Sequence, residues 1–192
     1  KISGGKNLKP TFSIMSIRPL SPHNDDSALF AQLQLNNVMV RGDARIAINA
    51  GLAKRYLSED KNTIRGINAF IDYDEEGNAR ASIGLEIKRS AFEAILNYYT
   101  NISNAQTVGD YTERVLTGGE ISLIGEVPYF PWANIIYKRQ EWSAEKNTND
   151  SESDKLSIEM QLTPHIILEG GVDDNNIDGQ QNFVKLFILC LQ

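Results

Sequence analysis

Residues 79–87 read Ala79-Arg80-Ala81-Ser82-Ile83-Gly84-Leu85-Glu86-Ile87, with an apolar residue at every second position. Because the side chains of a β-strand point alternately to the two faces of a sheet, this spacing predicts a strand with one apolar and one polar face. A helix would repeat its apolar residues at intervals of three and four positions instead. We therefore expect this segment to be a β-strand.

The same alternation recurs along the rest of the chain. It is clearest at 44–52, 67–73, 92–98 and 156–162, and weaker at 10–20, 28–40, 119–129, 133–142, 165–173 and 182–191. In the five clearest segments every position on one face is apolar or Tyr, and only Ala47, Phe70 and Ile95 are apolar between them. Residues that favour turns separate the strands. The chain of 192 residues is therefore predicted to be one all-β domain, 1–192, an antiparallel up-and-down meander of eleven visible strands.

The composition excludes several classes of function. There are 19 Lys and Arg against 25 Asp and Glu, and the net charge of −6 argues against a nucleic-acid partner, whose phosphates bind clustered basic residues. Cys190 is the single cysteine, so no internal disulfide can form, and only two His are present. We expect no metal and no cofactor. No apolar run approaches the length of a membrane-spanning helix.

Two architectures fit such a meander, and alternation alone does not separate them. A soluble barrel or sandwich turns its apolar face inward, whereas an outer-membrane barrel turns that face toward lipid. Roughly one strand per 16 residues suits membrane-spanning strands of about 9 to 11 residues plus a turn. Charged and amide residues also recur in mid-strand, where a wet interior would hold them without a desolvation cost. Both features favour the transmembrane barrel.

The lengths of the connections between strands also favour the transmembrane barrel, because outer-membrane barrels have long external loops and short periplasmic turns. Assigned backward from a periplasmic C-terminus, the outer connections are 174–181, 143–154, 102–117, 74–78 and 41–43. The inner connections are near 164 and at 130–132, 89–91, 57–62 and 21–27. The longest segments fall in the outer set. Tyr129, Phe130 and Trp132 are then expected at the inner membrane interface, where amphipathic rings prefer to lie.

The number of strands gives a further expectation. Bacterial single-chain barrels have an even number of strands, and an open edge in lipid leaves unpaired backbone groups. Twelve strands are therefore expected. The missing one should precede residue 1, with Lys1–Gly5 as its tail.

Several motifs occur in a fixed order over residues 27–190. They are Gly66-Ile67-Asn68-Ala69-Phe70-Ile71-Asp72-Tyr73-Asp74, Leu85-Glu86-Ile87-Lys88-Arg89, Asp110-Tyr111-Thr112-Glu113-Arg114, Gly118-Gly119-Glu120, Gly125-Glu126-Val127-Pro128-Tyr129-Phe130-Pro131, Leu162-Thr163-Pro164 and Gly171-Val172-Asp173. In order and spacing, this set resembles the β-domain of inverse autotransporters, the intimin and invasin family of bacterial outer-membrane adhesins. Glu126, Val115 and Lys138-Arg139 depart from the residues usual in that family.

The resemblance implies an outer-membrane anchor and translocator of the type V secretion class. In that family a C-terminal passenger crosses the barrel lumen as an extended hairpin and continues into immunoglobulin-like adhesin modules. Neither that linker nor such modules follow Gln192 in this sequence. The resemblance therefore implies anchoring and export, in the bacterial outer membrane, and leaves cell adhesion without support from these residues.

The alternation assigns side chains to the two sides of the barrel wall. The polar face is expected to line the lumen through Arg45, Asn49, Asp72, Arg80, Glu86, Lys88, Glu93, Asn97 and Glu159. The apolar face is expected to contact lipid through Ile46, Ile48, Leu52, Ile83, Leu85, Leu96, Ile158 and Leu162. A polar lumen with both signs of charge can hydrogen-bond a passing backbone without selecting one sequence.

Other candidate sites have a simpler interpretation. Arg41-Gly42-Asp43 could bind an integrin, but Gly-Asp is also common turn chemistry. His23 and His165 could serve a barrel hydrolase, but both fall in expected inner turns. The acidic segment 145–154 lacks the spacing of a calcium loop. We therefore expect no enzymatic activity.

The expected partners are outer-membrane lipid, the passenger segment within the lumen and the barrel assembly machinery, and the barrel is expected to be monomeric. Two alternatives remain at this point. One is a small passive outer-membrane pore without a passenger. The other is a soluble β-barrel that binds an apolar ligand in its interior.

Overall fold

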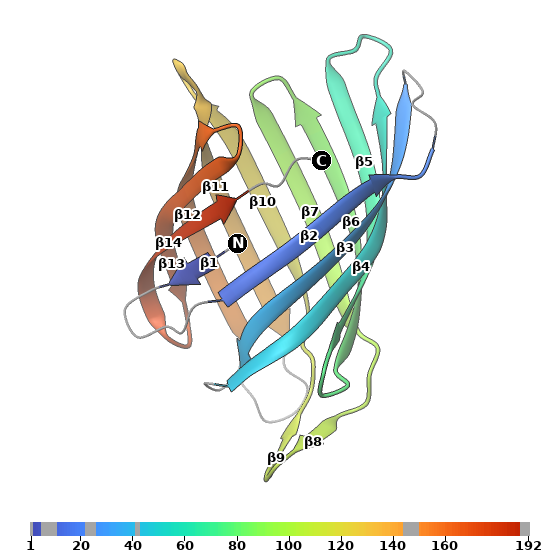
Figure 1. Cartoon of the computed structure of the whole chain (residues 1–192), viewed down its shortest axis with the longest axis vertical. Coiled ribbons are helices and arrows are strands. Elements are labelled where there is room, and N and C mark those ends of the chain that lie inside the picture. The colour runs from blue at the N-terminus through green and yellow to red at the C-terminus, as the bar shows by residue number, and fades with distance from the viewer. Residues whose placement is uncertain (1, 5–10, 22–25, 41–42, 144–149, 189–192) are drawn as a thin grey trace.

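A computed structural model describes residues 2–4, 11–21, 26–40, 43–143 and 150–188, and every regular element in these ranges is a β-strand (Figure 1). Twelve strands form a ring: β1 (Ile2–Gly4), β2 (Thr11–Pro19), β3 (Ser27–Val40), β4 (Asp43–Leu57), β5 (Thr63–Asp74), β6 (Ala79–Arg89), β7 (Phe92–Asn101), β10 (Thr117–Val127), β11 (Phe130–Ser143), β12 (Ser151–Thr163), β13 (Ile166–Asn175) and β14 (Gly179–Ile188). The other two, β8 (Gln106–Val108) and β9 (Tyr111–Glu113), form a separate hairpin. Within the described ranges no helix has the length and apolar character to cross a membrane.

The ring is an antiparallel up-and-down sheet, as the alternation predicts. Each strand pairs with the ring strands before and after it in the chain, and the hairpin β8–β9 is inserted between β7 and β10. The short strand β1 pairs with β14 through Ile2↔Leu186 and with β2 through Ile2↔Phe12. The twelfth strand therefore exists, although among the described residues it joins β14 to β2 over only a few positions.

The two ends of the ring carry different connections. One end, here called the turn end, has the connections 58–62, 90–91, 128–129 and 164–165, and β14 also finishes there. The opposite end, here called the hairpin end, has 75–78, 102–116 and 176–178. The strands run further than the alternation indicates, so the predicted outer loops 174–181 and 143–154 are too long. Of the predicted outer loops, only the β7–β10 connection, 102–116, is much longer than the connections at the turn end.

The turn predicted at 130–132 is also misplaced. Phe130 and Trp132 belong to β11, and the reversal is made by Pro128 and Tyr129, with Val127 paired to Phe130. Tyr129 has a φ of 69°, and a proline followed by a residue with positive φ is the pattern of a type II turn. The proline fixes the first turn position and so starts β11 earlier than the aromatic residues indicate.

The turn 58–62, at the same end of the ring, is held by its own side chains. The Ser58 hydroxyl donates a hydrogen bond to Asp60, and the backbone N–H of Asn62 donates to the same carboxylate at 3.2 Å. These bonds lower the pKa of Asp60, the Ser58 bond most strongly. The turn keeps an acidic side chain charged at one end of the barrel.

The pairing register aligns apolar residues on one face of the sheet from strand to strand. Leu52 lies opposite Ala69, which lies opposite Ile83, and Ile83 lies opposite Tyr98. Cross-strand apolar pairs of this kind stabilise a sheet, and a shift by one residue would move them all to the other face. The alternation in the sequence therefore fixes which face is apolar.

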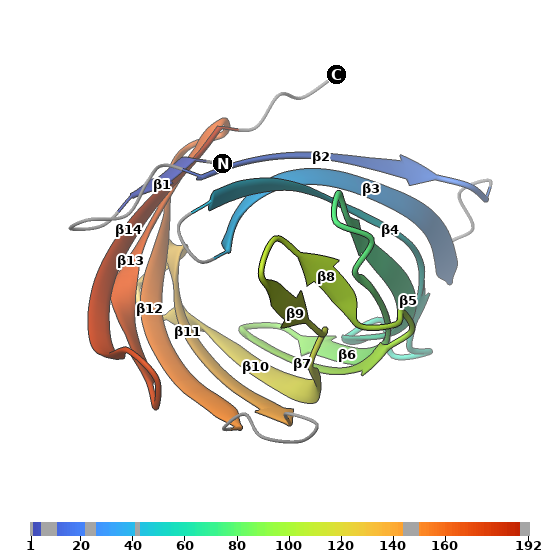
Figure 2. The same cartoon turned by 90° about the horizontal axis from the view of Figure 1, so that it is seen from below.

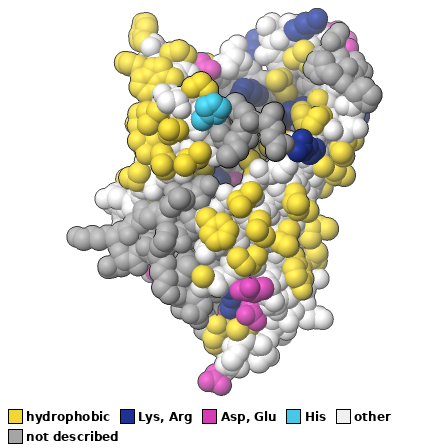
Figure 3. Space-filling model, viewed as in Figure 1, with side chains coloured by type: hydrophobic (Ala, Val, Ile, Leu, Met, Phe, Trp, Pro, Cys, Tyr) yellow, Lys and Arg dark blue, Asp and Glu magenta, His cyan; other side chains and the backbone are white. Residues whose placement is uncertain are grey.

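The apolar face is the exposed one. Among the described residues, Ala133 is the only buried hydrophobic residue, and no large side chain is fully buried. Figure 3 shows hydrophobic side chains spread over the visible outer surface of the strands. This arrangement is the reverse of a soluble barrel, which packs its apolar residues into a dry centre. The ring therefore has the inside-out distribution of a membrane barrel.

Candidate functional site

The eight residues predicted to face lipid all lie on the exposed apolar face. Their exposed fractions run from 37% for Ile46 to 62% for Ile83. The others are Ile48, Leu52, Leu85, Leu96, Ile158 and Leu162. In particular, Ile46, Leu85, Leu96 and Ile158 do not meet one another in a dry core.

The nine residues predicted to line the lumen all lie on the opposite face of the sheet. Asn49 pairs in register with Asp72 and Asp72 with Arg80, while Lys88 pairs with Glu93. Arg45, Glu86, Asn97 and Glu159 occupy the same face of their strands. Solvent reaches this inner face, because the Arg55 and Lys88 side chains are 49% and 54% exposed. The interior is therefore polar and wet.

A chain of polar and aromatic contacts runs along the inner wall from β4 to β11. Asn49 donates to Asp72, and Arg80 donates to the same carboxylate at 2.9 and 2.7 Å. The Arg80 guanidinium lies over the Tyr99 ring at 4.4 Å and over the Trp142 ring at 5.1 Å. The two rings lie 5.2 Å apart. These large side chains bind one another along the wall.

Ion pairs continue this wall toward the turn end. Arg55 on β4 forms a two-point pair with Glu86 on β6, across the glycine Gly66 on β5 between them. The Lys88 ammonium lies 3.3 Å from Glu93. Each of these charges therefore has an opposite charge as neighbour, which keeps the wall charged at low electrostatic cost.

The other half of the wall has an equivalent set that the sequence reasoning did not single out. Lys138 contacts Glu120 at 2.9 Å, and Gln140 donates to Glu120 at 2.7 Å. Glu169 accepts from Lys155 at 2.6 Å and from Ser157 at 2.9 Å. Glu120, Lys138, Gln140 and Glu169 were missed because the strands at 119–129, 133–142 and 165–173 alternate less clearly, although their position on the polar face was available from the same period.

The Glu169 carboxylate is the centre of this second set. It is 5% exposed and also lies 3.6 Å from the Lys185 ammonium. The ammonium groups of Lys155 and Lys185 lie 4.4 and 4.5 Å from the Phe183 ring. One buried carboxylate therefore links β12, β13 and β14 on the inner face.

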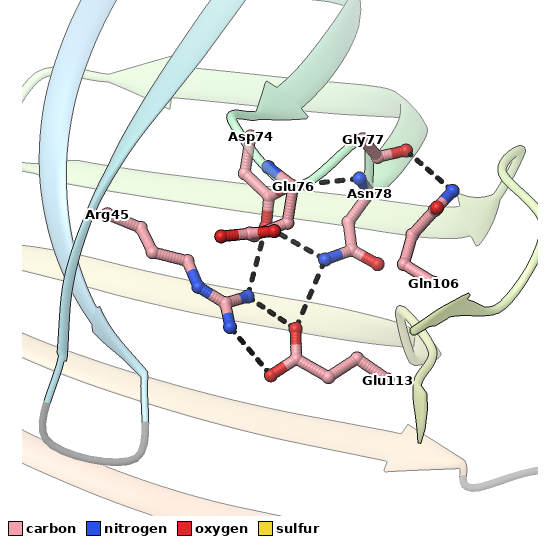
Figure 4. Close-up of polar contacts among 7 residues, drawn as sticks. All are labelled: Arg45, Asp74, Glu76, Gly77, Asn78, Gln106 and Glu113. Carbon is pink, nitrogen blue, oxygen red and sulfur yellow. Dashed lines mark hydrogen bonds and ion pairs between the residues drawn. The ribbon is translucent and has the colours of Figure 1, made fainter. Parts of the chain in front are cut away.

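The hairpin β8–β9 lies across the hairpin end of the ring (Figure 2). Its residue Glu113 accepts two hydrogen bonds from Arg45 on β4, one of them at 2.8 Å. Arg45 also lies 3.6 Å from Asp74, and its side chain is only 5% exposed (Figure 4). The loop that carries the Asp-Tyr-x-Glu-Arg motif is thus tied to the barrel wall by a charge on the inner face.

A second tie joins the hairpin to the β5–β6 turn. Asn78 donates to Asp74 at 2.9 Å and to Glu113 at 3.4 Å, and Gln106 on β8 donates to the Gly77 carbonyl at 3.2 Å. The Asp74 carboxylate also accepts the backbone N–H of Asn78 and so fixes the turn. Arg45, Asp74, Asn78 and Glu113 are here called the hairpin cluster. The cluster holds the hairpin at one mouth of the barrel.

The aromatic residues predicted at the interface lie at the turn end. Tyr129 is 97% exposed, and the rings of Phe130 and Trp132 pack edge to face with centroids 5.6 Å apart. Sequence reasoning placed Phe130 and Trp132 in the turn and Tyr129 at the end of the preceding strand, whereas in the structure Tyr129 belongs to the turn and Phe130 and Trp132 belong to β11.

The other candidate sites gain no support. Residues 41–42 of the Arg-Gly-Asp sequence, His23 and residues 145–149 lie outside the described residues. Within the acidic segment, Glu152 and Asp154 belong to β12 and pair with Arg139. In the parts of the chain that the structure describes, no three His, Cys, Asp or Glu side chains gather as a metal site would require.

Comparison with known families matches residues 5–187 to the inverse autotransporter β-domain. The chain belongs to this family. The resemblance inferred from the sequence motifs is thereby confirmed, and with it an outer-membrane β-barrel of the type V secretion class. The inverse autotransporter β-domain is an anchor and secretion domain, and this chain is a bacterial outer-membrane protein. A search of curated proteins finds no match.

Solved structures show the same fold for this β-domain. A chain from work on the in-meso crystallization of membrane proteins matches with a TM-score of 0.84 and 18% identity, over 97% of this chain and 79% of that chain. The KdgM porin matches with a TM-score of 0.58 and 7% identity, over 99% and 96%. OccAB4 of Acinetobacter baumannii matches with a TM-score of 0.58 and 11% identity, over 98% of this β-domain and 56% of that chain.

Proposed function

We propose that this β-domain anchors a passenger polypeptide in the outer membrane and exports it through the barrel interior. The observation that carries the proposal is the difference between the two faces of the barrel wall. Its inner face is polar, solvent-accessible and lined by charges of both signs, while its outer face is apolar and exposed. Such an interior can hydrogen-bond an extended backbone without demanding one sequence.

The positions of the strand ends support one direction of export. β14 finishes at the turn end, so a passenger that follows it starts on that side. With the turn end in the periplasm, as is usual for barrels with short periplasmic turns, the passenger must return through the interior to reach the outside. It then meets the hairpin β8–β9 at its exit.

The residue roles follow from the two faces. The lumen-lining role belongs to Arg45, Asn49, Asp72, Arg80, Glu86, Lys88, Glu93, Asn97 and Glu159. Lipid contact belongs to Ile46, Ile48, Leu52, Ile83, Leu85, Leu96, Ile158 and Leu162. Tyr129, Phe130 and Trp132 anchor the turn end at the membrane interface.

The proposed role needs no catalytic step, because export through a lumen forms and breaks no bond. Its partners are lipid, the passenger and the machinery that inserts outer-membrane barrels, and the unit is a monomeric barrel. An adhesin-type passenger is the one that family membership supports.

The proposal is tested by placing an epitope-tagged β-sandwich domain after Gln192 and labelling the tag on intact cells. Ala53→Trp adds bulk to the inner face of β4, and Leu52→Trp adds it to the outer face one residue away. We expect surface labelling of the parent and of Leu52→Trp, and reduced labelling of Ala53→Trp at equal barrel content. A tag that stays periplasmic in the parent barrel would refute the proposal.

A passive pore without a passenger is the second candidate, and the likeness to the fold of the KdgM porin favours it. The two functions differ in what blocks the current. A translocator that holds its passenger in the lumen should conduct poorly until the passenger is removed by proteolysis. A pore should conduct equally with and without a downstream domain.

A further inference from the structure

Five glycines on the inner face of the barrel are covered by residues of the neighbouring strand. Each faces its cover directly in the pairing register: Gly51 and Phe70, Gly66 and Glu86, Gly84 and Asn97, Gly118 and Trp142, Gly171 and Ser157. A Cβ atom on any of them would lie 2.1 to 2.4 Å from an atom of the adjacent strand. There is no room for even a methyl group at these positions.

Glycines on the outer face are different. A Cβ atom on Gly119, Gly125 or Gly170 would have its nearest neighbour at 3.6, 4.0 and 3.8 Å. Gly119 follows Gly118 directly, and Gly170 precedes Gly171, so the same strands contain both kinds. The crowding is therefore found at glycines on the inner face of these strands and not at those on the outer face.

At Gly51, Gly66 and Gly84 the nearest covering atom belongs to an inward side chain of the facing residue, whereas at Gly118 and Gly171 it is a backbone oxygen of the neighbouring strand. A Cβ on Gly51 would lie 2.1 Å from the Phe70 ring, and one on Gly84 would lie 2.1 Å from the Asn97 amide oxygen. A side chain that occupies this space lies across the neighbouring strand, along the wall. If the glycine carried a Cβ, the side chain would have to turn away from the wall into the interior.

We propose that the inner-face glycines set the free cross-section of the barrel by accommodating side chains that would otherwise project into the lumen. The inference rests on the proposed export function, because it identifies the residues that keep the passage clear. The wall keeps its charges and aromatic rings for hydrogen bonding, and the glycines hold them at the edge of the passage. A passenger chain would then meet a polar wall with few protrusions.

Gly66 and Gly84 provide the clean test. At both positions the colliding atoms are side-chain atoms only, from Glu86 and from Asn97 with Asn68, whereas backbone atoms also collide at Gly51, Gly118 and Gly171. Gly66→Ala and Gly84→Ala should therefore displace a side chain without breaking the strand pairing. Gly119→Ala and Gly170→Ala are matched controls on the outer face.

The measurement is single-channel conductance of the full 192-residue chain in planar bilayers. We expect lower conductance than the parent for Gly66→Ala and Gly84→Ala, and parental conductance for Gly119→Ala and Gly170→Ala. The double variant Gly84→Ala/Asn97→Ala removes the nearer of the two displaced side chains, while Asn68 is retained, and should recover part of the lost current. Heat-modifiable migration on gels verifies that each variant forms a barrel.

Three results would overturn the inference. One is unchanged conductance in both inner-face variants, and another is a parent barrel that carries no current. The third is that neither Gly66→Ala nor Gly84→Ala forms a barrel and that adding Asn97→Ala to Gly84→Ala does not restore barrel formation. The glycines would then be required for folding. The export proposal is judged separately, by surface labelling of the passenger, so it can stand or fall independently of these outcomes.

Discussion

Arg45 on β4 and Glu113 on the β8–β9 hairpin, 68 positions apart in the chain, form a two-point ion pair at the hairpin end of the barrel. The pair ties the longest described connection to the inner wall. Arg45→Gln should therefore free the hairpin, with a cost to the tied state of about 1–3 kcal/mol, because the nearly buried Glu113 carboxylate loses its charged hydrogen-bond partner. Hydrogen exchange of the backbone amides of 106–113 should become faster while that of β4 stays slow.

Arg139→Gln is the matched control for this change. Arg139 also pairs with acidic groups, but they lie on the exposed face. Its loss should leave exchange of 106–113 unchanged. Equal exchange rates in the parent and in Arg45→Gln would show that the hairpin cluster does not hold the hairpin.

The second prediction concerns the ion pairs of the Glu169 carboxylate and their contribution to the stability of the barrel. Lys155→Met leaves this buried acid with Lys185 at 3.6 Å as its cationic neighbour, and should lower the free energy of unfolding by about 1–3 kcal/mol. Denaturant unfolding in detergent micelles measures the change. Adding Glu169→Gln to Lys155→Met should recover part of the loss, and no recovery would mean that the two groups are not coupled.

We predict that a charged substitution on β6 costs more stability on the outer face than on the inner face. Leu85→Arg places a charge on the apolar exposed face and should cost about 2–4 kcal/mol if that position lies near the bilayer midplane. Ser82→Lys on the inner face of the same strand should cost much less, since water reaches that side. Unfolding in lipid vesicles compares the two, and similar costs would contradict the assignment of the faces.

The turn at Pro128 and Tyr129 predicts a stabilising substitution. Tyr129 has a φ of 69°, which costs a non-glycine residue about 1–2 kcal/mol. Because its side chain is 97% exposed, Tyr129→Gly loses little packing within the protein, and in detergent micelles, which lack the bilayer interface, it should raise the unfolding free energy by about 1 kcal/mol. Tyr129→Ala should show no such gain, and an equal gain for both would assign the effect to the side chain and not to the backbone.

The sequence predicts the faces of the strands better than their ends. The assignment of Ile83 and Leu85 to one face and of Glu86 to the other required only the period of two, which a register fixes along the whole strand. Strand ends depend on turn geometry, so the reversal at Pro128 and Tyr129 was placed too late in the chain. The twelfth strand was inferred from parity alone and is present as Ile2–Gly4.

Contacts between segments that lie far apart in the chain could not be predicted from the sequence. The motif containing Glu113 was recognised, but its pairing with Arg45 depends on how the β7–β10 connection folds back over the ring. Glu120, Lys138 and Glu169 were overlooked because their strands alternate less regularly. The covered glycines also appear only when neighbouring strands are placed side by side, since Gly84 and Asn97 are not related by any local pattern.

The central claim is that the apolar face contacts lipid and the polar face encloses water. It is tested most directly by single spin labels at Ile46, Leu85, Leu96 and Ile158, and at Asn49, Glu86, Asn97 and Glu159, in the barrel reconstituted in vesicles. We expect the first four labels to be relaxed mainly by oxygen, which partitions into acyl chains, and the second four by a water-soluble nickel complex. Labels at the first four positions that are shielded from both reagents, or that respond to the nickel complex, would contradict the account.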